Sequence, residues 1–357
     1  MNAPADPRSR QLNLGFDRFS GLYLWALIIL VFGLWLPSLF LTVATVHSIA
    51  SQQSIGAIVA IAVLIPLSAG AYDLSVGAVV NLAAIMVAVL QTERGWSMWP
   101  AIAVTVVACF VIGAVNGLIV VRFKVNSFIA TLGTASIITA VQSIVSGESQ
   151  PLPPTASLWN NLTQTTVLGF QIVFVYLLVI AVLAWWVLAH TPAGRYIYAT
   201  GGNPEAARLS GVRTGRWTWI SLITSSTLCG VAGVLYSSLS GPSLTFGDAL
   251  LLPAFAAAFL GSTQLFPGRF NVWGTMIAMF ALATGIKGLQ LETGVQWLPD
   301  MFNGVAVVTA VSFAVWRQTA VRGQRRRHAL GETSAAAEGQ EAEPGEPGRV
   351  MSPVKSD

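Results

Sequence analysis

The strongest constraint on this chain of 357 residues is a series of ten apolar runs separated by short polar segments. A run of about 20 apolar residues is long enough to cross a bilayer as a helix. Charged residues make up only 10% of the chain, against about 25% in soluble domains. We therefore predict an all-α, polytopic membrane protein of about ten transmembrane helices. The runs are Leu22–Leu41, Gln53–Ser68, Leu74–Leu90, Met98–Val121, Ser127–Val145, Gly169–Leu188, Trp217–Tyr236, Ala249–Phe266, Asn271–Ile286 and Trp297–Trp316.

Several of these runs are shorter than a straight span, and Pro66, Gly70 and Pro253 interrupt them. Short, broken spans are typical of helices that stop partway across the membrane and line a cavity. The other interpretation is that the helix ends lie elsewhere than the apolar runs suggest.

The basic residues predict the orientation of the chain. With the N-terminus in the cytoplasm, all of the 19 lysines and arginines except Arg94 and Lys287 fall on the cytoplasmic side, as the positive-inside rule requires. Losing or gaining one span would destroy this asymmetry, so both termini are expected inside. The net charge of +4 is explained by topology and needs no nucleic-acid partner.

The chain divides into three predicted parts. Residues 1–20 form a cytoplasmic N-terminal segment, and residues 21–316 form the transmembrane domain with one long cytoplasmic loop, 190–216. Residues 317–357 have too little apolar surface to fold and are expected to form a disordered cytoplasmic tail. The basic cluster Arg322–Arg327 at its start is expected to contact anionic lipid headgroups.

No arrangement of residues predicts an enzyme. None of the three lysines completes a phosphate-binding P-loop, so any ATP hydrolysis must occur in a separate subunit. The two cysteines and three histidines are isolated, and we predict no metal site.

Asp73 is the clear exception to the scarcity of charge within the apolar segments. Followed by Leu74 and Ser75, it resembles a helix cap, whose carboxylate accepts hydrogen bonds from free N–H groups. A direct role of Asp73 and Ser75 in transport is the alternative. One carboxylate is little support for an ion-coupled carrier, which usually needs ionisable groups within the membrane.

The cytoplasmic loop contains one short predicted helix with a start signal and a stop signal. Asn203 is its predicted N-cap, Pro204 occupies the first helical position, Glu205 lies at the positive end, and Gly211 ends the helix. So short a helix is unstable alone and must pack either on its own protein or on a partner.

Four motifs, in the same order, resemble those of ribose/xylose-type ABC transporter permeases. The resemblance extends from Phe19 to Trp316, and Ser262, Pro267 and Phe270 depart from the family pattern in the fourth motif. The motifs are Asp73–Gly77 (DLSVG), Ser127–Thr134 (SFIATLGT), Gly194–Gly211 (GRYIYATGGN followed by PEAARLSG) and Gly261–Arg269 (GSTQLFPGR).

The resemblance implies the membrane subunit of an importer in a bacterial inner membrane, with the fold of type II ABC importers and two inverted repeats. The implied partners are a second copy of the chain, a cytoplasmic ABC ATPase that holds ATP and Mg²⁺, and a periplasmic sugar-binding protein. No cofactor is expected on this chain. The loop helix would be the coupling helix, with its contact residues Asn203, Glu205, Ala206, Ala207, Arg208 and Gly211.

The fifth run carries a candidate lining for the translocation path. Its uncharged hydrogen-bonding groups suit sugar hydroxyls, although small polar residues also serve in packing between membrane helices. The predicted function is the ATP-driven import of a monosaccharide or a similar small polyhydroxylated solute, whose identity the sequence leaves open. The alternatives are an ion-coupled secondary carrier of a small neutral solute and a non-transporting receptor or scaffold. The candidate path residues are Thr131, Thr134, Ser136, Thr139 and Gln142.

Overall fold

The computed structural model describes residues 16–295, 297–298, 301–306, 308–309 and 312. The chain divides into two units, Met1–Val311 and Ser312–Asp357, and all elements named below belong to the first. Most of the predicted N-terminal segment 1–20 and the whole predicted tail 317–357 lie outside the described residues.

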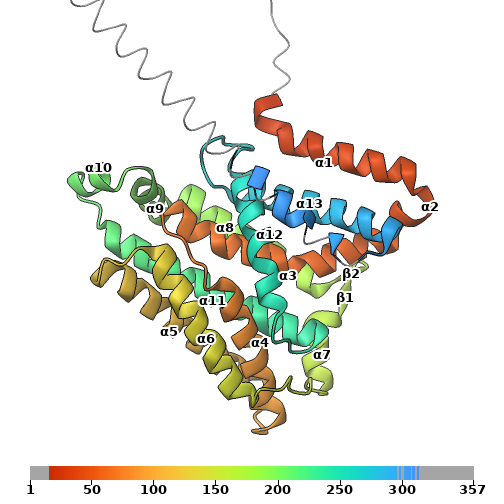
Figure 1. Cartoon of the computed structure of the whole chain (residues 1–357), viewed down its shortest axis with the longest axis horizontal. Helices are drawn as coiled ribbons and strands as arrows, with labels where there is room; N and C mark the ends of the chain where they lie inside the picture. Colours follow the sequence, from red (N-terminus) through yellow and green to blue (C-terminus); the bar gives the residue numbers. More distant parts are fainter. Residues whose placement is uncertain (1–15, 296, 299–300, 307, 310–311, 313–357) are drawn as a thin grey trace, which may run out of the picture. The chain divides into compact units, whose positions relative to one another are not determined.

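Helices account for nearly all of the described secondary structure (Figure 1). One antiparallel pair of two-residue strands, β1 (Thr166–Val167) and β2 (Phe170–Gln171), pairs Thr166 with Gln171. The helices are α1 (Phe16–Trp35), α2 (Pro37–Phe40), α3 (Val43–Ser68), α4 (Val76–Thr92), α5 (Met98–Arg122), α6 (Ser127–Ser146), α7 (Ser157–Gln164), α8 (Ile172–His190), α9 (Pro192–Gly202), α10 (Pro204–Leu209), α11 (Thr214–Ser240), α12 (Phe246–Gly261) and α13 (Val272–Thr293).

Six of the described helices, α3, α5, α6, α8, α11 and α13, are long and apolar enough to cross a membrane. Gly21–Trp35 in α1, together with α4 and α12, forms shorter apolar helices. The tenth run, Trp297–Trp316, is described only in fragments. The prediction of an all-α, multi-pass membrane protein is therefore confirmed.

Of the three predicted interruptions, only Gly70 lies at a break. α3 continues through Pro66 to Ser68, and α12 continues through Pro253. Gly70 has a φ of 78°, a left-handed conformation that glycine adopts without steric cost. We call residues 69–75, which join α3 to α4, the α3–α4 link.

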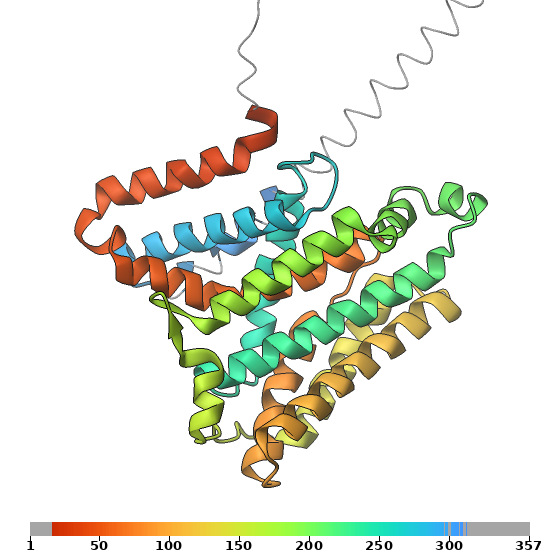
Figure 2. The same cartoon turned by 180° about the vertical axis from the view of Figure 1, so that it is seen from behind.

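α3 lies at the centre of the described fold, whereas the long helices α5, α6 and α8 lie at its periphery. In its most apolar window 78% of the residues are buried, against 22% in α6 and in α8 and 28% in α5. Seen from behind, α11 runs beside α5, and α3 runs beside α8 (Figure 2). The exposed faces of α5, α6 and α8 are thus available to lipid or to another subunit.

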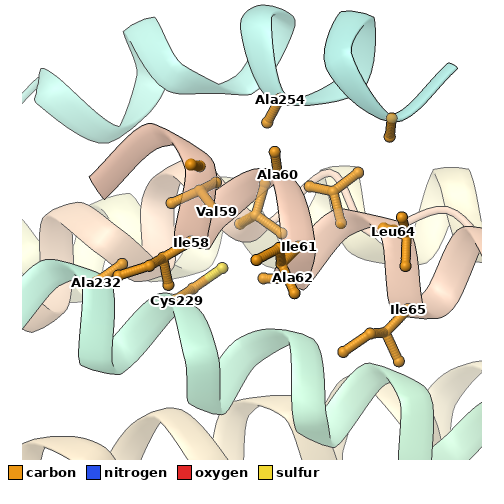
Figure 3. Packing of buried hydrophobic residues seen from close by; sticks show 14 of the residues in the cluster. Ile58, Val59, Ala60, Ile61, Ala62, Leu64, Ile65, Cys229, Ala232 and Ala254 are labelled. Atoms are coloured by element: carbon orange, nitrogen blue, oxygen red, sulfur yellow. The ribbon is translucent and has the colours of Figure 1, made fainter. Parts of the chain in front are cut away.

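Small and branched side chains alternate where α3 meets its neighbours. Figure 3 shows Ile58 of α3 beside Cys229 and Ala232 of α11, while Ala60 points toward Ala254 of α12. All five of these side chains are buried. Small residues at such contacts let helix backbones approach closely, which strengthens packing where no hydrophobic driving force acts between helices.

The two short helices α4 and α12 begin against one another. Asn81 Oδ1 of α4 accepts a hydrogen bond from the Gly247 N–H at 2.6 Å, and this amide lies in the first turn of α12. A methyl group built on Gly77 would lie 2.8 Å from the Gly247 carbonyl oxygen. Backbone therefore touches backbone here, with no room for a side chain.

We expect Gly77→Ala to destabilise the protein, because the neighbouring atoms are backbone and cannot rotate away. Overpacking of this kind costs about 1–3 kcal/mol. Gly133→Ala in α6 is the matched control: it has open space around it and gains helix propensity of up to about 1 kcal/mol. Thermal unfolding of the purified protein in detergent compares the two. Equal stability of both variants would contradict the contact.

Candidate functional site: the α9–α10 segment and the α3–α4 link

The predicted capped helix in the loop 190–216 is confirmed as α10. Asn203 Oδ1 accepts a hydrogen bond from the Ala206 N–H at 3.0 Å, and Pro204 occupies the first helical position. Gly211, after the end of the helix, has a φ of 83°. The residue types at these positions are those that the two helix ends require.

A second helix, α9, directly precedes α10 and was not predicted. Its N-cap is Thr191, whose hydroxyl accepts from the Gly194 N–H, and Pro192 is its first residue. The pair Thr191-Pro192 repeats the pattern of Asn203-Pro204, so the same capping rule would have found this helix. A single residue, Asn203, separates the two helices.

α10 presents a mixed polar and apolar face to its surroundings. Glu205 and Arg208 pair at 2.6 Å with both side chains about two-thirds exposed, and such a surface pair contributes little to stability. Leu209 is 82% exposed, whereas Ala207 is buried against the protein itself. Ala206, Asn203 and Gly211 are exposed.

Two of these observations differ from what the sequence suggests. Leu209 is exposed, although it is not among the predicted contact residues. Ala207 is among the predicted contact residues, but its side chain is buried in the fold. A bulky residue at 207 would therefore disturb the packing of α10 on its own protein before it met any partner.

Tyr198 attaches α9 to the loop between α12 and α13. Its hydroxyl donates to the Phe270 carbonyl oxygen at 2.6 Å, and the Arg269 guanidinium lies 3.7 Å from the centre of its ring. Burial raises the pKa of Tyr198, and the Arg269 charge offsets part of this rise. The hydroxyl therefore keeps its proton and remains a donor at neutral pH.

Asn271 gives this loop a fixed shape. Its side-chain amide donates to the carbonyl oxygens of Gly261 and Gln264 at 3.0 and 3.1 Å, and its Oδ1 accepts from the Gly274 N–H at 2.7 Å. The same side chain thus closes the loop and caps α13. The fourth sequence motif, Gly261–Arg269, therefore lies in a loop of fixed shape, and Tyr198 of α9 contacts Arg269 at the end of the motif.

The α3–α4 link is held by side chains of α6. The Tyr72 N–H donates to Ser127 Oγ at 3.0 Å, and the Leu74 N–H donates to Thr131 Oγ1 at 2.9 Å. Because the link is not helical, these amides have no partner within their own segment, and α6 supplies one to each. Thr131, a candidate path residue, is fully buried in this role.

The side chain of Asp73 accepts its hydrogen bonds from Ser75, within the same link. It is fully buried, and its Oδ1 accepts from both the N–H and the hydroxyl of Ser75, at 3.1 and 2.6 Å. Ser75 Oγ in turn accepts from the side-chain amide of Asn116 in α5 at 2.9 Å. The predicted cap is not formed by Asp73: the N-cap of α4 is Ser75, which makes no capping bond, and Asp73 bonds to Ser75 ahead of the helix while Ser75 connects the link to α5.

The other candidate path residues of α6 divide between two sides of the helix. Gln142 is buried and its amide donates to the Leu244 carbonyl at 3.0 Å. Thr134 is half-buried, while Ser136 and Thr139 are exposed and donate to carbonyl oxygens of their own helix. The structure therefore does not bring the five together in one cavity of the described residues.

A cavity of about 370 Å³ lies elsewhere, between α7 and the end of α11. Its walls include Trp159, Asn160 and Ser237. None of the candidate path residues lines it.

These observations define the class as a multi-pass α-helical membrane protein with a capped helix pair packed on its membrane helices. The family model for the permease component of branched-chain amino acid transport systems matches residues 45–311. The chain belongs to this family, which confirms the resemblance to ABC transporter permeases. No solved structure matches the chain.

Three relatives cover most of the chain. It is 32% identical to the ribose import permease protein RbsC of Haemophilus influenzae, over 76% of this chain and 85% of that permease. It is 31% identical to the fructose import permease protein FrcC of Rhizobium meliloti, over 81% of this chain and 83% of that permease. It is 26% identical to the D-allose transport system permease protein AlsC of Escherichia coli, over 78% of this chain and 87% of that permease.

We expect Tyr198→Phe to lower the stability of the folded protein by about 1 kcal/mol, the net contribution of one hydrogen bond. Because the pKa of Tyr198 is raised in the fold, the stability that it contributes is present below about pH 10 and is lost as the pH rises further. Thermal unfolding in detergent measures both effects. Tyr196→Phe, in the same helix, is the control, since the described residues show no hydrogen bond from its hydroxyl.

Proposed function

We propose that the chain is the membrane-spanning subunit of an ATP-driven importer that translocates a monosaccharide or a similar small polyhydroxylated solute. The observation that carries this proposal is the identity of about 30% with import permeases for ribose and fructose, over three quarters or more of the chain. The permease itself is not an enzyme. ATP and Mg²⁺ bind a separate cytoplasmic ATPase, and a periplasmic binding protein delivers the solute.

The charge of the buried residues favours a sugar over the amino acids in the family description. A zwitterionic amino acid brings an ammonium and a carboxylate group that must each be paired, whereas a sugar needs only hydrogen bonds. Among the described residues, Asp73 is the one buried charged side chain, and it is hydrogen-bonded to Ser75. The same scarcity disfavours ion coupling.

Transport in proteoliposomes tests this function. The permease, its ATPase and its binding protein are reconstituted with labelled ribose, fructose or allose outside. We expect uptake of one of these solutes only with ATP in the compartment that holds the ATPase. Uptake that follows an ion gradient without ATP would establish the secondary carrier instead, and ATP-dependent uptake of leucine alone would overturn the solute class.

We place the ATPase contact on α10, with the loop 190–216 in the cytoplasm. Glu205, Ala206 and Leu209 are exposed and can meet a partner directly, and Arg208 pairs with Glu205 beside them. Asn203 and Gly211 fix the two ends of the helix, while the buried Ala207 holds it on the permease. A partner that covers Leu209 would remove a large apolar side chain from water, which favours binding.

Leu209→Asp is expected to weaken ATPase binding by about 10- to 100-fold. Burying a leucine contributes about 1.5–3 kcal/mol, and each 1.4 kcal/mol corresponds to a factor of about ten in affinity. Co-purification of the ATPase with the permease measures the effect. Leu168→Asp is the control, because Leu168 is also exposed but lies between β1 and β2. Retention of the ATPase by Leu209→Asp at wild-type stoichiometry would exclude α10 as the docking helix.

The proposed topology has ten spans, both termini in the cytoplasm and two inverted repeats, in a homodimer in the bacterial inner membrane. The asymmetry of the basic residues supports the orientation. The short helices α4 and α12, which begin against each other at Gly77 and Gly247, are arranged as repeats related by a pseudo-two-fold axis would be. The exposed faces of α5, α6 and α8 offer surface for a second copy.

Single cysteines test this topology. In a variant that lacks Cys109 and Cys229, both of which are buried, a cysteine at Ser149 is expected to react with an impermeant maleimide from the periplasmic side. A cysteine at Ser210 is expected to react only after the membrane is opened. Labelling of both positions from the same side would contradict the assignment.

A further inference from the structure

We propose that Gly201 is a positioning residue through which α9 sets the place of the α3–α4 link, and thereby of α6, when an ATPase acts on α10. This inference rests on the proposed function. It assigns a role to a residue outside the docking helix and outside the membrane spans.

The contact at Gly201 joins backbone to backbone. A methyl group built on Gly201 would overlap the Ser68 carbonyl oxygen, at the end of α3, and would lie 2.9 Å from the Gly70 nitrogen. A methyl group built on Gly70 would in turn lie 3.2 Å from the Gly201 Cα. Because no side chain lies between the two segments, a movement of α9 at this point displaces the link directly.

Tyr198 holds α9 in place one turn before Gly201, on the same face of the helix. Tyr198 and Gly201 are three residues apart, so they lie on one side of the helix. Tyr198 is bonded to Phe270 of the α12–α13 loop. α9 therefore has an anchor at Tyr198 and a contact with the link at Gly201, and it continues into α10 after the single residue Asn203. A force on α10 has a short path to the link.

The link passes that displacement to α6. It is not helical, and two of its amides are bonded to Ser127 and Thr131 in the first part of α6. Moving the link without moving α6 would break these bonds and leave amides unpaired. The order of contacts is thus α10, α9, the α3–α4 link and α6.

Gly201→Ala and Gly202→Ala test the inference as a matched pair. Both glycines lie at the end of α9, but Gly202 has no atom within 4 Å of the position of a new methyl group. We expect Gly201→Ala to keep the ATPase bound and its basal hydrolysis unchanged. It should lose the stimulation by the loaded binding protein and lower uptake at least tenfold, whereas Gly202→Ala should match the wild type in all four measurements.

Uptake by Gly201→Ala at the wild-type rate would overturn the inference. Loss of the ATPase from Gly201→Ala alone would also overturn it, because the residue would then act in docking. Failure of the wild-type permease to bind any ATPase would refute the proposed function instead, and would do so before either glycine is changed.

Thr131→Val provides a second test if Gly201→Ala does not assemble. It removes the bond to the Leu74 amide on the opposite side of the link. We expect it to reduce stimulated uptake at least tenfold with the ATPase still bound. Thr139→Val in the same helix is the control, since Thr139 is exposed and bonds only to its own helix. Wild-type uptake by Thr131→Val would show that the link does not act on α6.

Discussion

The structure depends on how the backbone amides are satisfied where the chain between α3 and α4 leaves the helix. Backbone amides outside a helix have no acceptor within their own segment and must bond elsewhere. In the α3–α4 link the amides of Tyr72 and Leu74 bind hydroxyls of α6, and the amide of Ser75 binds Asp73. The turn between the two helices is therefore held by acceptors that α6 and the link's own Asp73 supply.

The same requirement makes the link a junction between elements that are distant in the sequence. α6 holds it through two hydroxyls, and α5 reaches it through Asn116 and Ser75. The backbone of α9 touches it at Gly201. A movement of any of these three helices therefore acts on the link, which gives a physical reason for a break near a capped surface helix.

Features with a local or compositional cause could be predicted from the sequence. The apolar runs predicted a multi-pass helical protein, since hydropathy and length alone decide whether a helix can span a bilayer. The capped helix α10 followed from Asn203, Pro204 and Gly211, because caps act within one turn. The family followed from four ordered motifs. α9 was missed although Thr191 and Pro192 carry the same signal.

What the sequence determined by itself is therefore the medium in which the protein folds, the family to which it belongs and the ends of its short helix. Only the tertiary structure decided which side of each element faces inward. Periodicity could not show that Ala207 is buried while Leu209 is exposed, or that Thr131 binds a link instead of lining a cavity. Thr131 lies in a membrane helix, where both faces are apolar and the pattern that marks a buried face in water is absent. α10 has only six residues, too few for a periodicity to show its inner side. In both helices burial is fixed by contacts between residues far apart in the chain.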